Sequence, residues 1–118
     1  MPDFVTRGME VDLKHVFTLD SHVVFDPTNT TIEIVHYSGT TEIIDLIETP
    51  MTRIKEGHFL YTWTIPSDFP ENKTAFVYFR GTDSSNNRAV YEKVLRIVPA
   101  DFFNGSNPDG LTVKFTKV

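Results

Sequence analysis

Polar and apolar residues alternate along several segments of this sequence, and this period of two limits what the chain can fold into. The clearest segments are residues 10–18 and 58–65. Their apolar positions hold Val11, Leu13, Phe17, Phe59, Tyr61, Trp63 and Ile65, and His15 falls among them. Because successive side chains of a β-strand point to opposite faces, the alternation predicts strands with one face in a core.

The composition also favours β-structure. Ten phenylalanines and four tyrosines accompany many β-branched residues, and such side chains suit a pleated, half-buried surface. We therefore expect further strands at residues 32–37, 41–48, 74–80 and 88–98, and a short one at 51–55 that pairs with the strand after it. A competing interpretation of residues 41–54 is a helix, since Ile43 and Ile47 are four positions apart, although Pro50 would end it.

Turn-forming residues separate these segments. They occur at residues 26–29, 38–39, 49–50, 56–57, 66–68 and 81–87. The last of these, GTDSSNN, is the clearest hairpin loop, because Asn and Asp tolerate left-handed backbone and bond back to their own main chain. Short strands divided by turn signals predict a single all-β domain, either a sandwich or a barrel.

Four segments resemble immunoglobulin-like domains of bacteria and phages, and the last of them, residues 88–98, resembles the closing strand. Residues 57–66, GHFLYTWTIP, resemble a strand of the form G-x-Y-x-a-x-W-x-I-P, and residues 76–87, FVYFRGTDSSNN, resemble the next strand and its hairpin. Residues 26–34, DPTNTTIEI, resemble the beginning of an earlier strand. The combination is similar to that of small immunoglobulin-like proteins of tailed-phage particles. It implies an immunoglobulin-like antiparallel β-sandwich over residues 1–98, with Trp63 in its core, followed by a C-terminal extension at residues 99–118.

No motif for catalysis or metal binding accompanies these fold signals. The chain has no cysteine, no Gly-x-Ser-x-Gly turn and no glycine-rich phosphate loop. The four histidines lie on separate segments without ligand spacing: His15, His22, His36 and His58. The oxygen-rich loop at residues 83–87 lacks the second carboxylate and the glycine of a calcium loop. We therefore expect no catalytic residue, no metal site and no cofactor, and a protein that is not an enzyme.

Charge and hydropathy narrow the possible partners. Eleven Lys and Arg against sixteen Asp and Glu give a net charge of −5, which is unfavourable for neutralising nucleic-acid phosphates. The longest apolar runs are too short to cross a bilayer as a helix. The first residues, MPDF, lack the basic and apolar regions of a secretory signal. We expect neither a nucleic acid nor a membrane as a partner.

The extension at residues 99–118 carries the candidate interaction site. Its first part, PADFFNGSNPDG, is typical of a linker except for Phe102 and Phe103, which would be unfavourable in water. Residues 111–118, LTVKFTKV, alternate again, with Leu111, Val113 and Phe115 on one side. This segment would pair within its own sheet, pair with the sheet edge of a neighbouring subunit, or stay disordered. We predict that these five residues mediate protein contacts and that the extension links copies into a homo-oligomer.

Two functions remain after these exclusions. The first is a structural or assembly protein of a tailed-phage particle, made in the host cytoplasm and located in the virion. It would dock on other virion proteins as a capsid decoration, neck or tail component. The second is a carbohydrate- or protein-binding immunoglobulin-like module of a bacterial surface protein, in which Tyr37, Tyr78 and Tyr91 would form the binding face if they turned outward together.

Overall fold

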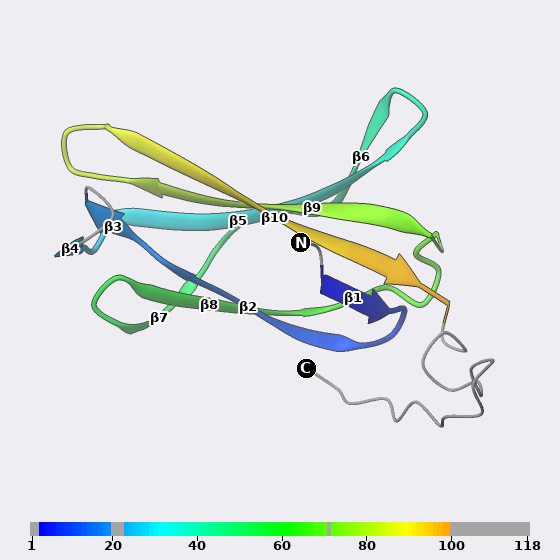
Figure 1. The fold of residues 1–118 in the computed structure, drawn as a ribbon. Helices are drawn as coiled ribbons and strands as arrows, with labels where there is room; N and C mark the ends of the chain where they lie inside the picture. The colour runs from blue at the N-terminus through cyan, green and yellow to red at the C-terminus, as the bar shows by residue number, and fades with distance from the viewer. Residues whose placement is uncertain (1–2, 20–22, 71, 100–118) are drawn as a thin grey trace.

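The computed structural model describes residues 3–19, 23–70 and 72–99, and these residues form ten β-strands and no helix (Figure 1). The strands are β1 (Asp3–Thr6), β2 (Glu10–Val16), β3 (Thr18–Leu19), β4 (Val23–Val24), β5 (Asn29–Ser38), β6 (Thr41–Pro50), β7 (Thr52–Lys55), β8 (His58–Thr64), β9 (Lys73–Thr82) and β10 (Arg88–Val98). The predicted C-terminal strand at residues 111–118 lies outside the described residues.

Two sheets form the layers of a sandwich (Figure 1). The larger sheet has the order β1-β10-β9-β5-β6 and the smaller has the order β2-β8-β7, while β3 and β4 form a separate pair. Every pairing is antiparallel except that of β1 with β10. The predicted all-β, mostly antiparallel sandwich is therefore confirmed for the described residues.

The strands expected before residue 99 are all present, and the helix considered for residues 41–54 is not. β6 pairs with β5, and β7 pairs with β8. The β-branched isoleucines of this segment favour extended backbone, and Pro50 is tolerated because it ends an edge strand. Residues 83–87 form the predicted hairpin turn, in which Asn86 adopts the left-handed conformation with φ of 66°.

The hydrophobic core lies between the two sheets and is built from the inward faces of the alternating strands. On β8, Phe59 and Trp63 are buried and Tyr61 is partly buried, as their shared face predicts. The indole of Trp63 is 5% exposed. It meets the ring of Phe69 edge to face, with centroids 6.3 Å apart. The largest fully buried side chains include Phe17, Phe69, Phe79, Leu13, Ile32, Ile34, Ile65, Leu95 and Ile97.

The β7–β8 turn requires a glycine. Gly57 has φ of 74°, and a Cβ at this position would collide with Cγ1 of Val24 and lie 3.0 Å from the carbonyl oxygen of Phe17. The Gly57 N–H donates to Oδ1 of Asp26 at 2.7 Å. The turn is thereby held against the segment that follows β4.

The β5–β6 hairpin extends beyond the rest of the sandwich at one end (Figure 1). Gly39 forms its turn with φ of 64°. Val98, at the end of β10, lies at this same end of the larger sheet, because Ile97 is opposite Lys73 at the start of β9 and Val35 is opposite Phe76. The segment that follows Val98 therefore leaves the sandwich at the end where β6 begins.

We predict that Trp63→Ala lowers the free energy of unfolding by about 3–5 kcal/mol, because it removes a large buried ring and leaves a cavity. Urea unfolding measured by circular dichroism gives this difference. Thr64→Ala, at an exposed position of the same strand, is the control and changes the free energy by less than about 1 kcal/mol. A fluorescence maximum typical of indole in water, measured on the folded protein, would contradict the buried position of Trp63.

Candidate interaction surface

The outer face of the larger sheet, which is turned away from the smaller sheet, carries a row of apolar side chains. Val94 on β10 lies opposite Phe76 on β9, Phe76 lies opposite Val35 on β5, and Val35 lies opposite Ile44 on β6. These four residues are called the apolar row. Val35 is 0% exposed in the middle of it, whereas Ile44 at its end is 50% exposed. The row is therefore covered at its centre and open at the β6 edge.

Two tyrosines lie beside the apolar row on the same face. The ring of Tyr37 meets Phe76 edge to face, with centroids 5.7 Å apart, and its hydroxyl donates to Oε2 of Glu42 at 3.3 Å. Burial raises the pKa of Tyr78, and neighbouring Tyr37 and Glu92 raise it further. Tyr78 therefore stays neutral in ordinary buffers and offers a hydroxyl beside an acidic side chain.

A charged pair borders these tyrosines. Nη1 of Arg80 lies 3.0 Å from Oε1 of Glu33, and both side chains are only about one-quarter exposed or less, at 24% and 20%. The guanidinium also lies over the ring of Tyr78, 5.5 Å from its centroid, a position that favours a cation. Arg80 is thus held in place on the outer face by two neighbours.

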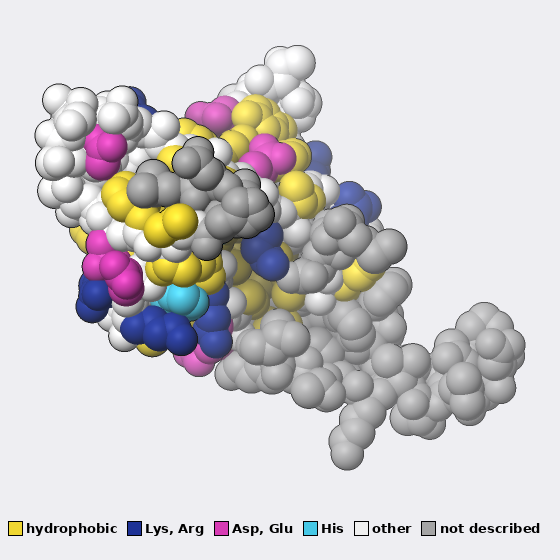
Figure 2. All heavy atoms as spheres, turned by 60° about the vertical axis from the view of Figure 1, so that its left-hand side comes forward, with side chains coloured by type: hydrophobic (Ala, Val, Ile, Leu, Met, Phe, Trp, Pro, Cys, Tyr) yellow, Lys and Arg dark blue, Asp and Glu magenta, His cyan; other side chains and the backbone are white. Residues whose placement is uncertain are grey.

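Strand β6 forms one edge of the larger sheet, and among the described strands it is hydrogen-bonded to β5 alone. Three of its isoleucines are exposed by 39%, 50% and 71%: Ile43, Ile44 and Ile47. Three of its other residues are acidic, namely Glu42, Asp45 and Glu48, and residues 41–50 contain no Lys or Arg. Figure 2 shows hydrophobic and acidic side chains close together below the tip of the β5–β6 hairpin, in the upper part of the view. An edge strand of this composition is suited to pairing with another chain.

A buried histidine–carboxylate contact anchors β6 to β5. Nδ1 of His36 lies 2.8 Å from Oδ2 of Asp45, and the two side chains are 6% and 9% exposed. Burial raises the pKa of Asp45, while the contact with His36 opposes this shift. The pairing of β5 with β6 changes register between Ile34 and Val35, opposite Asp45. The irregularity turns Asp45 toward His36 and leaves residues 41–44 in regular pairing.

His15 lies half-buried on the inward side of β2 among aromatic rings. Its ring is stacked on Phe79 with centroids 5.0 Å apart, and it lies 4.7 Å from Phe17 and 4.3 Å from Tyr91. Its buried Nε2 has no hydrogen-bond partner among the described residues, and burial lowers the pKa of His15. Tyr91 therefore packs on the inner side of the sheet, so Tyr37, Tyr78 and Tyr91 do not share one face.

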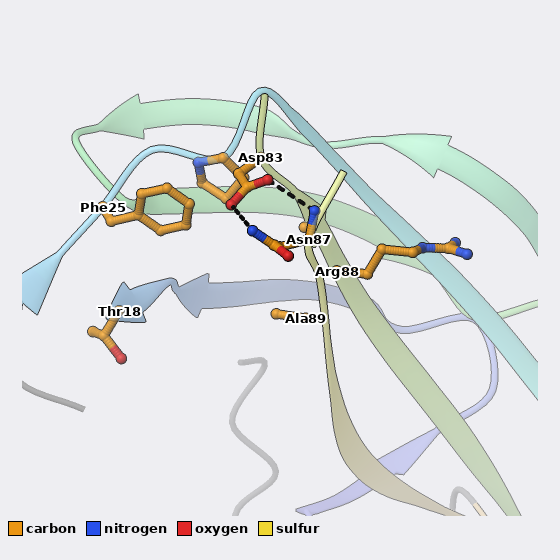
Figure 3. A pocket seen from close by; sticks show the side chains of 8 residues that line it. Thr18, Phe25, Asp83, Asn87, Arg88 and Ala89 are labelled. Carbon is orange, nitrogen blue, oxygen red and sulfur yellow. Dashed lines mark hydrogen bonds between the residues drawn. The ribbon is translucent and has the colours of Figure 1, made fainter. Parts of the chain in front are cut away.

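A small pocket of about 110 Å³ opens beside the β9–β10 turn (Figure 3). It is lined by Thr18, Phe25, Pro27, Gly81, Asp83, Asn87, Arg88 and Ala89. Oδ1 of Asp83 accepts hydrogen bonds from the backbone N–H groups of Ser85 and Asn87, and Oδ2 accepts one from Nδ2 of Asn87 at 3.0 Å. These bonds, that of the Asn87 side chain first, lower the pKa of Asp83. Because its bonds lie within the loop, the Asp83 carboxylate shapes the turn. The side chain of Arg88 points away from the pocket (Figure 3).

The prediction from the sequence that five residues of the extension mediate contacts stays a prediction. Phe102, Phe103, Leu111, Val113 and Phe115 lie outside the described residues. Sequence reasoning identified residues 41–48 as a strand but not as the edge of a sheet. A signal was present, because this segment combines isoleucines with carboxylates and has no cation.

We predict that the free energy of unfolding decreases as the pH falls from 7.5 to 5.5, in part through His15. The folded-state pKa of His15 is lowered, so the unfolded chain binds the proton more readily. The contribution of this group is complete above the unfolded pKa of about 6.5 and is lost as the pH falls below it.

Urea unfolding across this pH range measures the effect. His15→Phe should remove part of the pH dependence and keep the aromatic packing. The control is His58→Gln, a change at a histidine whose Nδ1 contacts the carbonyl oxygen of Glu56. This variant should keep the part of the pH dependence that comes from His15. Equal slopes in the wild type and His15→Phe would show that this ring does not titrate as its burial implies.

Three further observations bear on the class of this site. No group of three or more His, Cys, Asp or Glu side chains that could hold a metal ion occurs in the described part of the chain. No helix long and apolar enough to cross a membrane is found in residues 3–19, 23–70 and 72–99. Comparison with the models of known protein families and with curated proteins found no match to this chain.

Proposed function

We propose that this chain is a non-enzymatic structural protein of a tailed-phage particle that docks on other virion proteins, as a capsid decoration, neck or tail component. The observation that carries the proposal is the β6 edge, where a ten-residue strand exposes three isoleucines. Exposed apolar side chains on an edge strand are costly for a free monomer and are used when a partner covers them. The role is therefore one of protein–protein contact, with the virion as the location and the host cytoplasm as the place of synthesis.

The link to phage particles rests on the sequence resemblance. The structure shows which strands the resembling segments form. Residues 57–66 supply β8, and residues 76–87 supply most of β9 and its turn. These segments hold the two sheets together, so the resemblance concerns the scaffold. The β6 edge, where the apolar row ends at the exposed Ile44, is the part of that scaffold that is open to a partner.

The second candidate is a carbohydrate- or protein-binding module of a bacterial surface protein. Tyr37 and Tyr78 lie on one face near Glu42 and Glu92. Aromatic rings beside carboxylates suit sugars, because the ring stacks on the apolar face of the sugar and the carboxylate accepts its hydroxyls. Binding of a glycan that is lost in both Tyr37→Ala and Tyr78→Ala would favour this candidate over the first.

We predict that the protein is present in purified particles and that Ile47→Lys reduces its copy number per particle about tenfold, which corresponds to about 1.4 kcal/mol of docking free energy. Ile47 is 71% exposed on β6, and Ile54 is 53% exposed on β7. Ile54→Lys is the matched control and leaves the copy number unchanged. Quantitative mass spectrometry of particles assembled with each variant gene gives the numbers.

Two results would overturn the proposed function. One is the absence of the chain from particles produced by the genome that encodes it. The other is equal incorporation of Ile47→Lys and wild type, which would remove the β6 edge as the docking surface.

We predict that deletion of residues 99–118 leaves a cooperative unfolding transition within about 1 kcal/mol of the full chain, while the homo-oligomer is lost. The described strands form two sheets around a hydrophobic core of their own. Thermal unfolding and light scattering on the two forms measure stability and size. An unfolded or aggregated truncated protein would show that the extension belongs to the sandwich.

A further inference from the structure

Four strands form the edges of the two large sheets, and they differ in how they are protected. They are β1 and β6 in the larger sheet and β2 and β7 in the smaller. β1 and β7 have only four residues each, and β2 carries Lys14 at an exposed position. Short length and lysine both discourage pairing with another chain. β6 has ten residues and no cation. Its register shifts and the inward-facing Asp45 lie beyond Ile44, so residues 41–44 are the part of this edge that is most open to pairing.

The regular part of β6 is its first half. Residues 41–44 pair with residues 38–35 without interruption, and the register shifts begin beyond Ile44. Ile44 ends the apolar row, and Glu42 lies next to it on the same face, opposite Tyr37. A strand added at this edge would therefore lie opposite one carboxylate, that of Glu42, and one exposed apolar side chain, that of Ile44, two positions apart on the same face.

The negative charge of β6 favours a positively charged strand as its partner. Glu42, Asp45 and Glu48 are its charged residues, so pairing of β6 with a second β6 would bring like charges together, which is destabilising. A basic strand with alternating apolar residues is complementary. The chain itself contains such a segment at residues 111–118, LTVKFTKV, whose two charged residues are Lys114 and Lys117.

We propose that residues 111–118 of one copy pair antiparallel with residues 41–44 and the start of the irregular part of β6 in a second copy. In the register that places Lys117 opposite Glu42, Phe115 falls opposite Ile44, where it would extend the apolar row by one more strand. The inference rests on the proposed assembly function and deepens it, because it names a second copy of this chain as the virion protein that covers the β6 edge.

The length of the connection favours exchange between copies over pairing within one chain. A strand added beyond β6 lies four strand spacings from β10, roughly 19 Å, because the order is β10-β9-β5-β6. In this register it begins opposite Glu48, roughly 23 Å along β6 from Thr41. The combined span is roughly 30 Å, whereas a flexible chain as long as residues 99–110 has a root-mean-square span of about 19 Å. Pairing within one chain would hold this segment well beyond its root-mean-square span, a constraint that the β6 edge of a second, freely placed copy does not impose.

A charge-reversal experiment tests the proposed pairing. Glu42→Lys and Lys117→Glu should each raise the dissociation constant of the homo-oligomer at least tenfold, and the double variant should restore it to within about threefold, because the pair is re-formed with reversed signs. Sedimentation equilibrium of the full chain measures these constants. Glu10→Lys reverses an exposed charge on the β2 edge and should have no effect.

Disulfide trapping distinguishes exchange from pairing within a chain. The protein has no cysteine, so Ile44→Cys in one preparation and Phe115→Cys in another give one thiol per chain. Mixing them with copper phenanthroline should produce a covalent dimer that contains both variants. The doubly substituted chain, oxidised at high dilution, should remain uncrosslinked.

Each outcome decides the matter. An intrachain disulfide in the dilute double variant, a monomeric wild type, or single charge variants that associate as the wild type does would overturn the exchange between copies. These results leave the presence of the chain in particles as a separate question, which the mass spectrometry answers. Conversely, a chain that is absent from particles but forms the mixed dimer would refute the virion function and retain the strand exchange.

Discussion

The buried ring of Phe17 packs between the two sheets, and the close approach of the sheets depends on its position. The side chain is 1% exposed and meets the rings of His15 and Phe59 at 4.7 and 5.7 Å. Its backbone N–H donates to Gly57, and its carbonyl oxygen accepts from Phe25. A Cβ on Gly81 would lie 2.8 Å from the ring. Glycine on the central strand β9 thus makes room for Phe17, and the larger sheet can approach the smaller one.

Local patterns predicted most of the strands and little of their arrangement. Alternation located β2 and β8 because burial on one face imposes a period of two, and the Asn-rich turn was predicted because Asn86 can adopt positive φ. The parallel pairing of β1 with β10 joins the two ends of the described chain, and no local pattern specifies such a contact. The His36–Asp45 contact escaped prediction for the same reason, since it depends on a register shift between two strands.

Because local patterns do not predict the order of strands in a sheet, they also do not predict which residues form the candidate site. An edge and a central strand have the same alternation, so the sequence indicated a strand at residues 41–48 without its place in the sheet. Tyr37 and Tyr91 are alike in the sequence, yet one faces outward beside Phe76 and the other packs on His15. Which side chains are available to a partner follows from sheet order, and sheet order is a property of the assembled core.

The β9–β10 turn offers a practical use of this domain as a scaffold. Asp83 satisfies the backbone N–H groups of Ser85 and Asn87 from within the turn, so the loop needs no support from the rest of the molecule. It lies at the end of β9 that is opposite to Val98. Substitutions of Ser84 and Ser85, both exposed, would keep these bonds, because the bonds use backbone N–H groups. The new side chains would be displayed away from the β5–β6 hairpin, and an oligomer built through that hairpin would present them outward.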